Sequence, residues 1–409
     1  MSCDASKCCY LDHAAASSPK PQVVADAVSG WLLKEAGSAG RGAHEAARRA
    51  GALLTSVRQR LADLVNAEGP ERMLLTTCST DSLALAILGT LSPPCRPTDV
   101  RRKPRVVTTL LEHNAVARPL TALEESGTIE LVRVPFGEHG FVDPQAVLAE
   151  VNENTDLVAM NWVSNVLGTI QDVGAVGRGL RAKGSEAIFL VDGSQAAGYL
   201  DIDVQADCID LLAFNGQKAL RGPSGTGSLY IGPRAYRGDR DPALERLQPV
   251  RYGGTGGGGC HLPDELPDRF EVGTQNDAGF AGLDAALALG KAPSTSPLLG
   301  VCAKRVAEID GVDVLSSPDA AEFGKYLTGG RIGIMTLNIA GVDPLKAEAR
   351  CDEISKIAVR GGLHCAPWLH NQLGTDEQGG GLRVSVGWTS TEADIDRFVG
   401  AIHTIASEA

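Results

Sequence analysis

Short runs of apolar, often β-branched residues alternate with helix-length stretches through the middle of the chain. The runs predict strands at residues 73–75, 105–109, 129–135, 157–163, 188–191 and 209–214. The stretches between them predict helices at 115–126, 144–151 and 173–183, and a further helix from Ser82 onward. Strands that alternate with helices form a mostly parallel sheet with helices on both faces, so we predict an α/β fold.

Polar turns follow the ends of these runs, where ligands gather in parallel sheets. Asn165, Asp192 and Lys218 each lie at or just after a run. The turn at 76–81 opens a helix, whose free N–H groups can bind an anion. Each feature alone also fits a structural role without a ligand. The polar residues could form ordinary turns, Asp192 could cap the next helix, and Lys218 could be a solvated surface charge. Together, at successive strand ends, we expect them to converge on one pocket.

The C-terminal part predicts a second, smaller α/β unit. Its expected elements are a helical segment at 278–306 interrupted at 292–297, strands at 332–337 and 382–386, and a closing helix at 392–407. The glycine-rich stretch 253–259 contains G-x-G-x-x-G but lacks a flanking βαβ unit, so we interpret it as a flexible turn. We therefore expect an N-terminal arm (1–20) packed on the small domain, a large cofactor-binding domain (21–275) and a small domain (276–409).

Composition and charge exclude several classes of protein. The chain is 43% hydrophobic and 22% charged, as in folded globular proteins. Its net charge of −12 opposes nucleic-acid binding, and it lacks an apolar run that could span a membrane. The N-terminal residues carry no secretory pattern, so we expect a cytoplasmic protein. Glycine is abundant, at 48 of 409 residues, as expected where backbone turns approach a ligand closely.

The ten cysteines include no C-x-x-C pair, so we predict neither a zinc ribbon nor any other metal site. Reduced thiols that fill the core are the simplest interpretation for nine of them. Cys365 differs, because it lies in a Gly/His/Pro loop rather than in an apolar run. A nucleophilic cysteine needs exposure and a lowered pKa, and its neighbours His364 and Arg360 could supply positive charge.

Nine motifs in chain order give the sequence a specific resemblance. They are YLDHAAA at 10–16, CSTD at 78–81, EHNA at 112–115, SNVLGT at 164–169, VDGSQAAG at 191–198, FNGQK at 214–218, RFEVGTQN at 269–276, GLHCAP at 362–367 and RVSVG at 383–387. The chain resembles the class V aminotransferases, which are fold type I enzymes dependent on pyridoxal 5'-phosphate (PLP), and among them the cysteine desulfurases. The resemblance extends over nearly the whole chain.

The resemblance implies a set of residues that hold PLP. They are Lys218 as the Schiff-base lysine, Asp192 at the pyridine nitrogen, Gln195 at the phenolic oxygen, His113 stacked on the ring, and Ser79, Thr80, Asn215 and Gln217 around the phosphate. Thr274 matches a threonine that reaches the phosphate of the partner subunit's cofactor, which implies a homodimer.

The resemblance also implies the substrate and the reaction. Asn165 would lie near the substrate amino acid, Arg383 would bind its carboxylate, and Arg360 would stand at the entrance. Lys218 would move the substrate's α-proton, and Cys365 would remove the sulfur of L-cysteine as a persulfide, leaving L-alanine. Selenocysteine could follow the same route, and a sulfur-acceptor protein could take the persulfide.

Two positions depart from the family pattern. The residue before the lysine is Gln217 where the desulfurases usually carry histidine, and Asn215 replaces a frequent serine. Neither amide can become cationic, which leaves the cofactor affinity, its pH response and the substrate open. Two alternatives therefore remain: another PLP-dependent C–S lyase or transaminase, and a degenerate, non-catalytic scaffold subunit. Retention of Lys218, Asp192, Gln195 and Cys365 argues against the scaffold.

Overall fold

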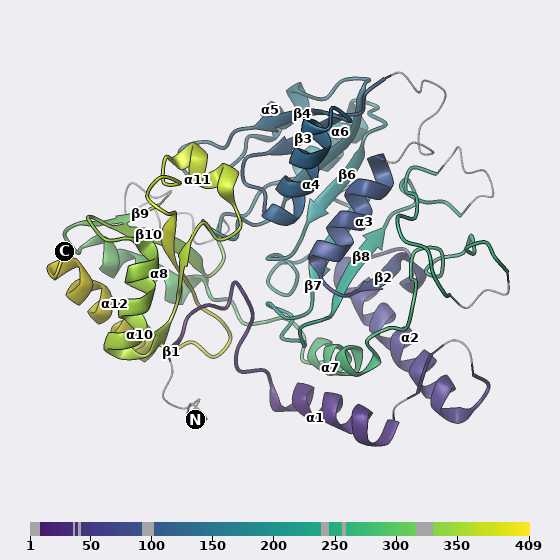
Figure 1. Cartoon of the computed structure of the whole chain (residues 1–409), viewed down its shortest axis with the longest axis horizontal. Coiled ribbons are helices and arrows are strands. Elements are labelled where there is room, and N and C mark those ends of the chain that lie inside the picture. The colour runs from purple at the N-terminus through teal and green to yellow at the C-terminus, as the bar shows by residue number, and fades with distance from the viewer. Residues whose placement is uncertain are drawn as a thin grey trace.

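A seven-stranded sheet forms the centre of the larger part of the molecule (Figure 1). The computed structural model describes residues 9–35, 37–39, 42–91, 102–238, 245–255, 259–315 and 330–409. In sheet order the strands are β2 (Met73–Thr76), β8 (Gly227–Ile231), β7 (Leu211–Asn215), β6 (Ile188–Asp192), β5 (Thr155–Asn161), β3 (Arg105–Thr109) and β4 (Glu130–Val134). Strand β8 runs in the direction opposite to the other six strands of this sheet. The predicted mostly parallel α/β fold is confirmed.

Helices cover both faces of this sheet, because successive strand residues point to opposite sides. Leu211 packs with the core beneath α3 (Ser79–Leu91) and α4 (Asn114–Glu125), whereas Leu212 packs on the other face. That other face is covered by α2 (Glu45–Val65), α5 (Pro144–Ala149) and α6 (Val173–Ala182). The central strands β5, β6 and β7 are buried on both faces, which explains why they appear in the sequence as largely apolar runs.

Most predicted elements occur within a residue or two of their expected bounds, although several elements, including α2 and the helices Gln22–Gly30 and Pro344–Ser355, were not predicted. Helix α3 begins at Ser79 rather than Ser82, because the N–H of Ser82 donates to the carbonyl of Cys78 and closes the first turn. Strand β8 was not predicted. It begins at Gly227, where a Cβ atom would lie only 2.6 Å from the backbone of Cys78. The glycine that interrupts the apolar pattern thus allows β8 to pass close to α3.

A smaller antiparallel sheet forms a second unit with its own core. Its strands, in order, are β12 (Arg360–Gly362), β13 (Gly381–Ser385), β10 (Ile334–Ile339) and β9 (Val312–Val314). Helices α8 (Ser296–Ala307), α10 (Pro344–Ser355) and α12 (Glu392–Ser407) pack on it, and α11 (Pro367–Leu373) follows the Cys365 loop. The side chains of Thr391 and Asp394 form a capping box that begins α12 where the sequence predicts it.

The predicted domain boundary at residue 275 falls just before α7 (Asp277–Leu287). Phe280 and Leu283 of this helix are buried in the core of the larger sheet, and the helix packs against α1 (Gln22–Gly30) and α2. We therefore propose that the boundary lies between α7 and α8. The turn at 253–259 contains no helix or strand in its described residues, and 256–258 lie outside them.

The N-terminal arm links the two units (Figure 1). Strand β1 (Cys9–Tyr10) pairs in parallel with β11 (Ile357–Ala358) of the smaller unit. The chain then crosses to α1, which is followed by a π-helical turn (Trp31–Glu35); a 3-10 turn (Pro70–Arg72) precedes β2. Cys9 and Leu11 are fully buried in the smaller unit's core, as expected for an arm that packs there. The described residues contain no helix long and apolar enough to cross a membrane.

Candidate active site

Lys218 lies in the turn after β7, at the carboxyl edge of the larger sheet. Within the described part of the chain, no acceptor or carboxylate pairs with its Nζ atom. Burial lowers the pKa of the lysine to about 8, against the opposing effect of Asp192. A lysine with so low a pKa has a useful neutral fraction near neutrality, and neutral Nζ is the nucleophilic form.

Asp192 ends β6, on the strand next to Lys218. Its Oδ1 atom accepts hydrogen bonds from the backbone N–H of Ser194 (2.9 Å) and from the Ser194 hydroxyl (2.5 Å). Its Oδ2 atom has no hydrogen-bond donor among the residues described. Asp192 favours the charged forms of both Lys218 and His113, so the three groups are close together. A buried carboxylate with a free oxygen fits the protonated nitrogen of a pyridine ring.

His113 caps α4 from the turn after β3. Its Nδ1 atom accepts from the N–H of Ala115 at 3.0 Å, which leaves Nε2 as the ring nitrogen that carries the proton in the neutral form. Burial lowers the pKa of this imidazole. His113 is therefore neutral near pH 7 and offers a flat, uncharged face.

The start of α3 and the end of β7 form the expected anion site. Asn215 Nδ2 donates to the hydroxyl of Ser79 at 3.1 Å, and Thr80 is exposed in the first helical turn. The first N–H groups of a helix of this length have no partner inside the helix. The side-chain oxygens of Asn215 and Gln217 are buried without a donor among the described residues, which marks an incompletely satisfied polar site. These residues fit a phosphate group.

Two arginines converge on one carboxylate of the N-terminal arm. Arg383 Nη2 donates to Asp12 Oδ1 at 2.8 Å, while Arg360 donates to Asp12 Oδ2 from Nε (3.1 Å) and Nη2 (2.7 Å). Arg383 also donates from Nη1 to the carbonyl of Asn165 at 3.0 Å, and its buried Nε has no acceptor in the described structure. The predicted substrate-binding residues Asn165, Arg360 and Arg383 thus lie together.

The loop that carries Cys365 has an unusual backbone. His364 (φ 51°) and Cys365 (φ 58°) both adopt the left-handed conformation, which side chains with a Cβ atom rarely take. Asn165 Nδ2 donates to the carbonyl of His364 at 2.7 Å, and the N–H of Asn114 donates to that of Cys365 at 2.6 Å. Two hydrogen bonds from the larger unit therefore hold this loop in place.

The Cys365 thiol is exposed and faces positive charge. Its thiolate form interacts with both Lys218 and Arg383, so the cysteine lies near the predicted cofactor lysine and the predicted carboxylate-binding arginine. His364 does not supply positive charge, contrary to the expectation from sequence. Burial, and after it the charge of nearby Arg383, lowers its pKa to about 3, so the imidazole is neutral.

The other described cysteines differ from Cys365 in burial or position. Cys302 and Cys351 are buried in the smaller unit's core, and burial raises the pKa of each thiol to about 12. Cys9 is buried as well, Cys78 and Cys208 are half-buried, and Cys260 is exposed in a loop. Cys3, Cys8 and Cys95 lie outside the described residues.

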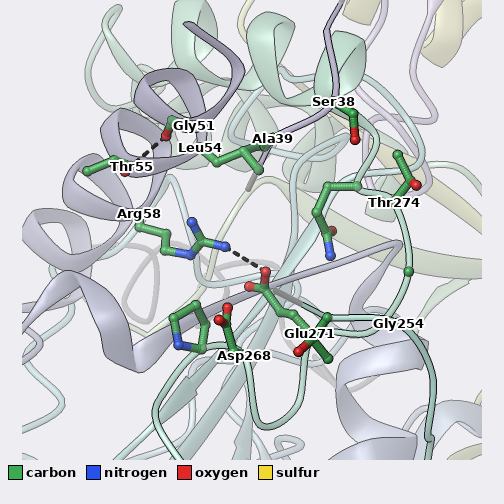
Figure 2. Close-up of a pocket in the computed structure, with 14 residues that line it drawn as sticks. Ser38, Ala39, Gly51, Leu54, Thr55, Arg58, Gly254, Asp268, Glu271 and Thr274 are labelled. Atoms are coloured by element: carbon green, nitrogen blue, oxygen red, sulfur yellow. Dashed lines mark hydrogen bonds and ion pairs between the residues drawn. The ribbon is translucent and has the colours of Figure 1, made fainter. Parts of the chain in front are cut away.

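Thr274 is exposed on a different side of the site, in a cavity of about 400 Å³ (Figure 2). Ser38, Arg58 and Glu271 line the same cavity, and Arg58 Nη2 pairs with Glu271 Oε2 at 2.6 Å. A smaller neighbouring cavity brings Thr274 near Thr77, which precedes α3. Among the described residues, no hydrogen bond joins Thr274 to another predicted site residue, and its role toward a partner subunit stays a prediction.

The arm also forms hydrogen bonds with both glutamines predicted to contact the cofactor. Gln195 Nε2 donates to the carbonyl of Ala14 at 2.9 Å, which leaves one of its two amide hydrogens free. The carbonyl of Gln217 accepts from the N–H of Ser17 (2.9 Å) and from Lys20 Nζ (2.6 Å). The arm therefore forms one wall of the site.

Sequence reasoning missed three contributors, although two of them lie in the quoted motifs. Asp12 bridges the arginines, and Glu112 is fully buried beside Asp192. Burial raises the pKa of Glu112 to about 8, although Thr109 Oγ1 (2.7 Å) and the N–H of Asn161 (3.0 Å) both donate to its Oε1 atom. No sequence motif indicated Lys20, because it contacts the site through the backbone carbonyl of Gln217.

Comparisons with known proteins agree with this geometry. A model of the family described as "Aminotransferase class-V" matches residues 9–398, and the chain belongs to the class V aminotransferase family. Enzymes of this family depend on PLP, which the residues around Lys218 fit. The resemblance inferred from the nine motifs is therefore confirmed.

The similar relatives within this family are cysteine desulfurases. The chain is 31% identical over 404 residues to a probable cysteine desulfurase of Methanothermobacter thermautotrophicus, covering 97% of this chain and 94% of the relative. It is 30% identical over 403 residues to a cysteine desulfurase of Dickeya dadantii, covering 97% and 91%.

Two solved structures extend the likeness to the fold. The apo cysteine desulfurase of Thermococcus onnurineus NA1 superposes with a TM-score of 0.84 at 26% identity, covering 99% of this chain and 96% of that one. The cysteine desulfurase CsdA of Escherichia coli, in an S-sulfonic acid form, gives 0.81 at 26% identity, covering 98% and 95%.

Proposed function

We propose that this protein is a PLP-dependent cysteine desulfurase that converts L-cysteine to L-alanine and keeps the sulfur on Cys365 as a persulfide. The observation that carries the proposal is the position of the Cys365 thiol, which is exposed yet close to the charges of Lys218 and Arg383. The cysteine desulfurases among its relatives support the same substrate.

The residues around Lys218 would hold PLP in a defined orientation. Lys218 would bind its aldehyde carbon, Asp192 Oδ2 its ring nitrogen, and the start of α3 with Asn215 its phosphate. His113 would stack on the ring, and Gln195 would donate its free amide hydrogen to the phenolic oxygen. When bound, PLP supplies an electron sink for bonds at the substrate's α-carbon.

The chain's own groups would then carry the sulfur transfer. Arg383 and Asn165 would hold the substrate carboxylate and amino acid backbone, and Lys218 would move the α-proton. The Cys365 thiolate would attack the substrate sulfur, breaking the Cβ–S bond and forming an S–S bond on the protein. The electron pair of the broken bond returns to the carbon fragment, which takes up a proton at Cβ and leaves as alanine.

The test is a product assay on wild-type protein and Cys365→Ser. We expect the wild type to form alanine from L-cysteine and to carry one reducible sulfur on Cys365. The variant should retain the cofactor absorbance but form no persulfide. Undiminished alanine formation by Cys365→Ser would overturn the persulfide mechanism.

A second candidate is a β-eliminating C–S lyase, favoured by Gln217 and Asn215 in place of the family's usual residues. Measuring pyruvate beside alanine, with L-cysteine, selenocysteine and a cysteine conjugate, separates the two. Pyruvate as the main product would favour the lyase.

Two partners belong to the same proposal. Thr274 is exposed and would face the cofactor phosphate of a second subunit, so we expect a homodimer with twice the 42.7 kDa chain mass by light scattering. The exposed Cys365 would pass its sulfur to an acceptor protein or thiol. A cytoplasmic location stays a prediction from sequence.

A further inference from the structure

We propose that Asp12 is a specificity-determining residue: by binding both arginines of the site, it restricts the substrate to amino acids with one carboxylate and excludes those with an anionic side chain. The inference rests on the proposed role of Arg383 in binding the substrate carboxylate. Asp12 comes from the N-terminal arm, whereas both arginines belong to the smaller unit.

The charge of the site carries the first step. Asp12 is buried, with 7% of its surface exposed, and its two oxygens are divided between the arginines: Oδ1 to Arg383 and Oδ2 to Arg360. One negative and two positive charges leave a net positive charge of one. That charge matches a single substrate carboxylate, and a second anionic group would enter without a counter-charge.

The directions of the hydrogen bonds carry the second step. Arg360 uses both Nε and Nη2 on one oxygen of Asp12, so one of the two edges of its guanidinium that can bind an anion in two-point fashion is occupied. Arg383 uses Nη1 for Asn165 and Nη2 for Asp12, and its Nε is buried without an acceptor in the described structure. Arg383 therefore keeps a donor for one carboxylate, whereas the charge of Arg360 and its Nε/Nη2 edge are taken up by Asp12.

Exposure separates the two arginines further. The side chain of Arg383 is 4% exposed, whereas that of Arg360 is 49% exposed and stands at the edge of the site. Removing the charge of Asp12 would thus release Arg360 where a second anionic group could reach it. The expected ligands for the altered site are amino acids with a side-chain carboxylate.

The experiment measures L-alanine and L-aspartate as ligands of the holoenzyme, by the change in cofactor absorbance and by competition with L-cysteine. In the wild type we expect no preference for L-aspartate. Asp12→Asn should improve the affinity ratio in favour of L-aspartate by about tenfold or more, the size expected of one new charge-assisted pair. Asp26→Asn, on the exposed face of α1, is the matched control and should leave the ratio unchanged.

A double variant identifies the arginine, and Arg360→Gln alone keeps the inference falsifiable if Asp12→Asn does not fold. Asp12→Asn/Arg360→Gln should lose the gained preference, and Arg360→Gln alone should leave the wild-type ratio as it was. A merely structural role for Asp12 would weaken both ligands alike. The inference is overturned if the ratio of L-aspartate to L-alanine affinity is unchanged in Asp12→Asn, or if Arg360→Gln alone shifts it. The proposed function is tested separately, by alanine formation from L-cysteine with the wild type.

Discussion

The backbone N–H of Asn114 donates to the carbonyl of Cys365 at 2.6 Å, joining the first residue of α4 to the cysteine of the opposite unit. The bond links the residue after His113 to the loop proposed to carry the persulfide. It also fixes how far the thiol stands from the cofactor side of the site.

Asn114→Pro removes this donor without the usual cost of a proline in a helix. Proline is well accepted at the first helical position, and His113 already has the extended conformation (φ −69°, ψ 154°) that a following proline requires. We expect a roughly fivefold loss in kcat, corresponding to about 1 kcal/mol for one hydrogen bond, with an unchanged cofactor spectrum. Asn114→Ala keeps the N–H and should retain its rate; equal losses in both variants would contradict the role of the bond.

Glu112 predicts a pH dependence of stability. Its pKa is raised from 4.5 to about 8 by burial, so the unfolded chain loses this proton before the folded one does. The stabilising effect of the proton is fully present below pH 4.5 and is lost progressively as the pH rises to 8. Glu112→Gln keeps an oxygen for the two donors and cannot ionise.

The free energy of unfolding of Glu112→Gln minus that of the wild type should therefore increase between pH 4.5 and 8, by at most ~1.4 kcal/mol per pH unit, and level off above. Urea unfolding of the two proteins at several pH values measures it. A difference that is flat across this range would show that Glu112 is ionised in the folded protein.

Alanine substitutions at two glycines that follow Cys365 in the chain distinguish the cost of backbone strain from the cost of a steric clash. Gly374 (φ 67°) and Gly380 (φ 97°) both have left-handed backbones, but only at Gly380 would a Cβ atom meet another group, the carbonyl of Gly362. Alanine at Gly374 should cost about 1 kcal/mol in stability. Alanine at Gly380 should cost more and also lower kcat, because Gly362 leads into the Cys365 loop. Thermal unfolding and steady-state rates measure both effects, and a normal rate in Gly380→Ala would argue that the loop tolerates the shift.

Gln217→His restores the residue usual in the desulfurases beside Lys218. Histidine has an ordinary pKa near 6.5, so it adds a positive charge near the phosphate only at lower pH. We expect tighter PLP binding than in the wild type below about pH 6.5 and similar binding at pH 8, measured by absorbance titration of the apoprotein. Gln205→His, at an exposed position, is the control. Equal affinities at both pH values would place residue 217 away from the phosphate.

The sequence was sufficient for the larger sheet because its buried strands are short apolar runs that end in polar residues. Strand β8 was not predicted, because its position depends on the close approach of Gly227 to Cys78, which no local sequence pattern indicates. Asp192 and Lys218 could be placed together because neighbouring parallel strands end at the same edge, whereas His113 was assigned to the site by the family resemblance.

The ion pairs of Asp12 and the low pKa of His364 are two features of the site that could not be predicted from the sequence. Both residues lie in quoted motifs, yet the ion pairs of Asp12 span 348 and 371 positions along the chain. The low pKa of His364 depends on its burial and on nearby Arg383. Long-range pairing and burial are set by tertiary packing, so neither could be derived from spacing.

The docking of the arm has a consequence for biosynthesis. Cys9 and Tyr10 leave the ribosome long before their strand partners, Ile357 and Ala358, which lie 348 positions further along the chain. A contact so distant along the chain cannot form while the larger sheet assembles during synthesis. Asp12 therefore reaches its arginines only after the smaller unit has been synthesised, and until then a nascent chain has no complete site in which to begin sulfur chemistry.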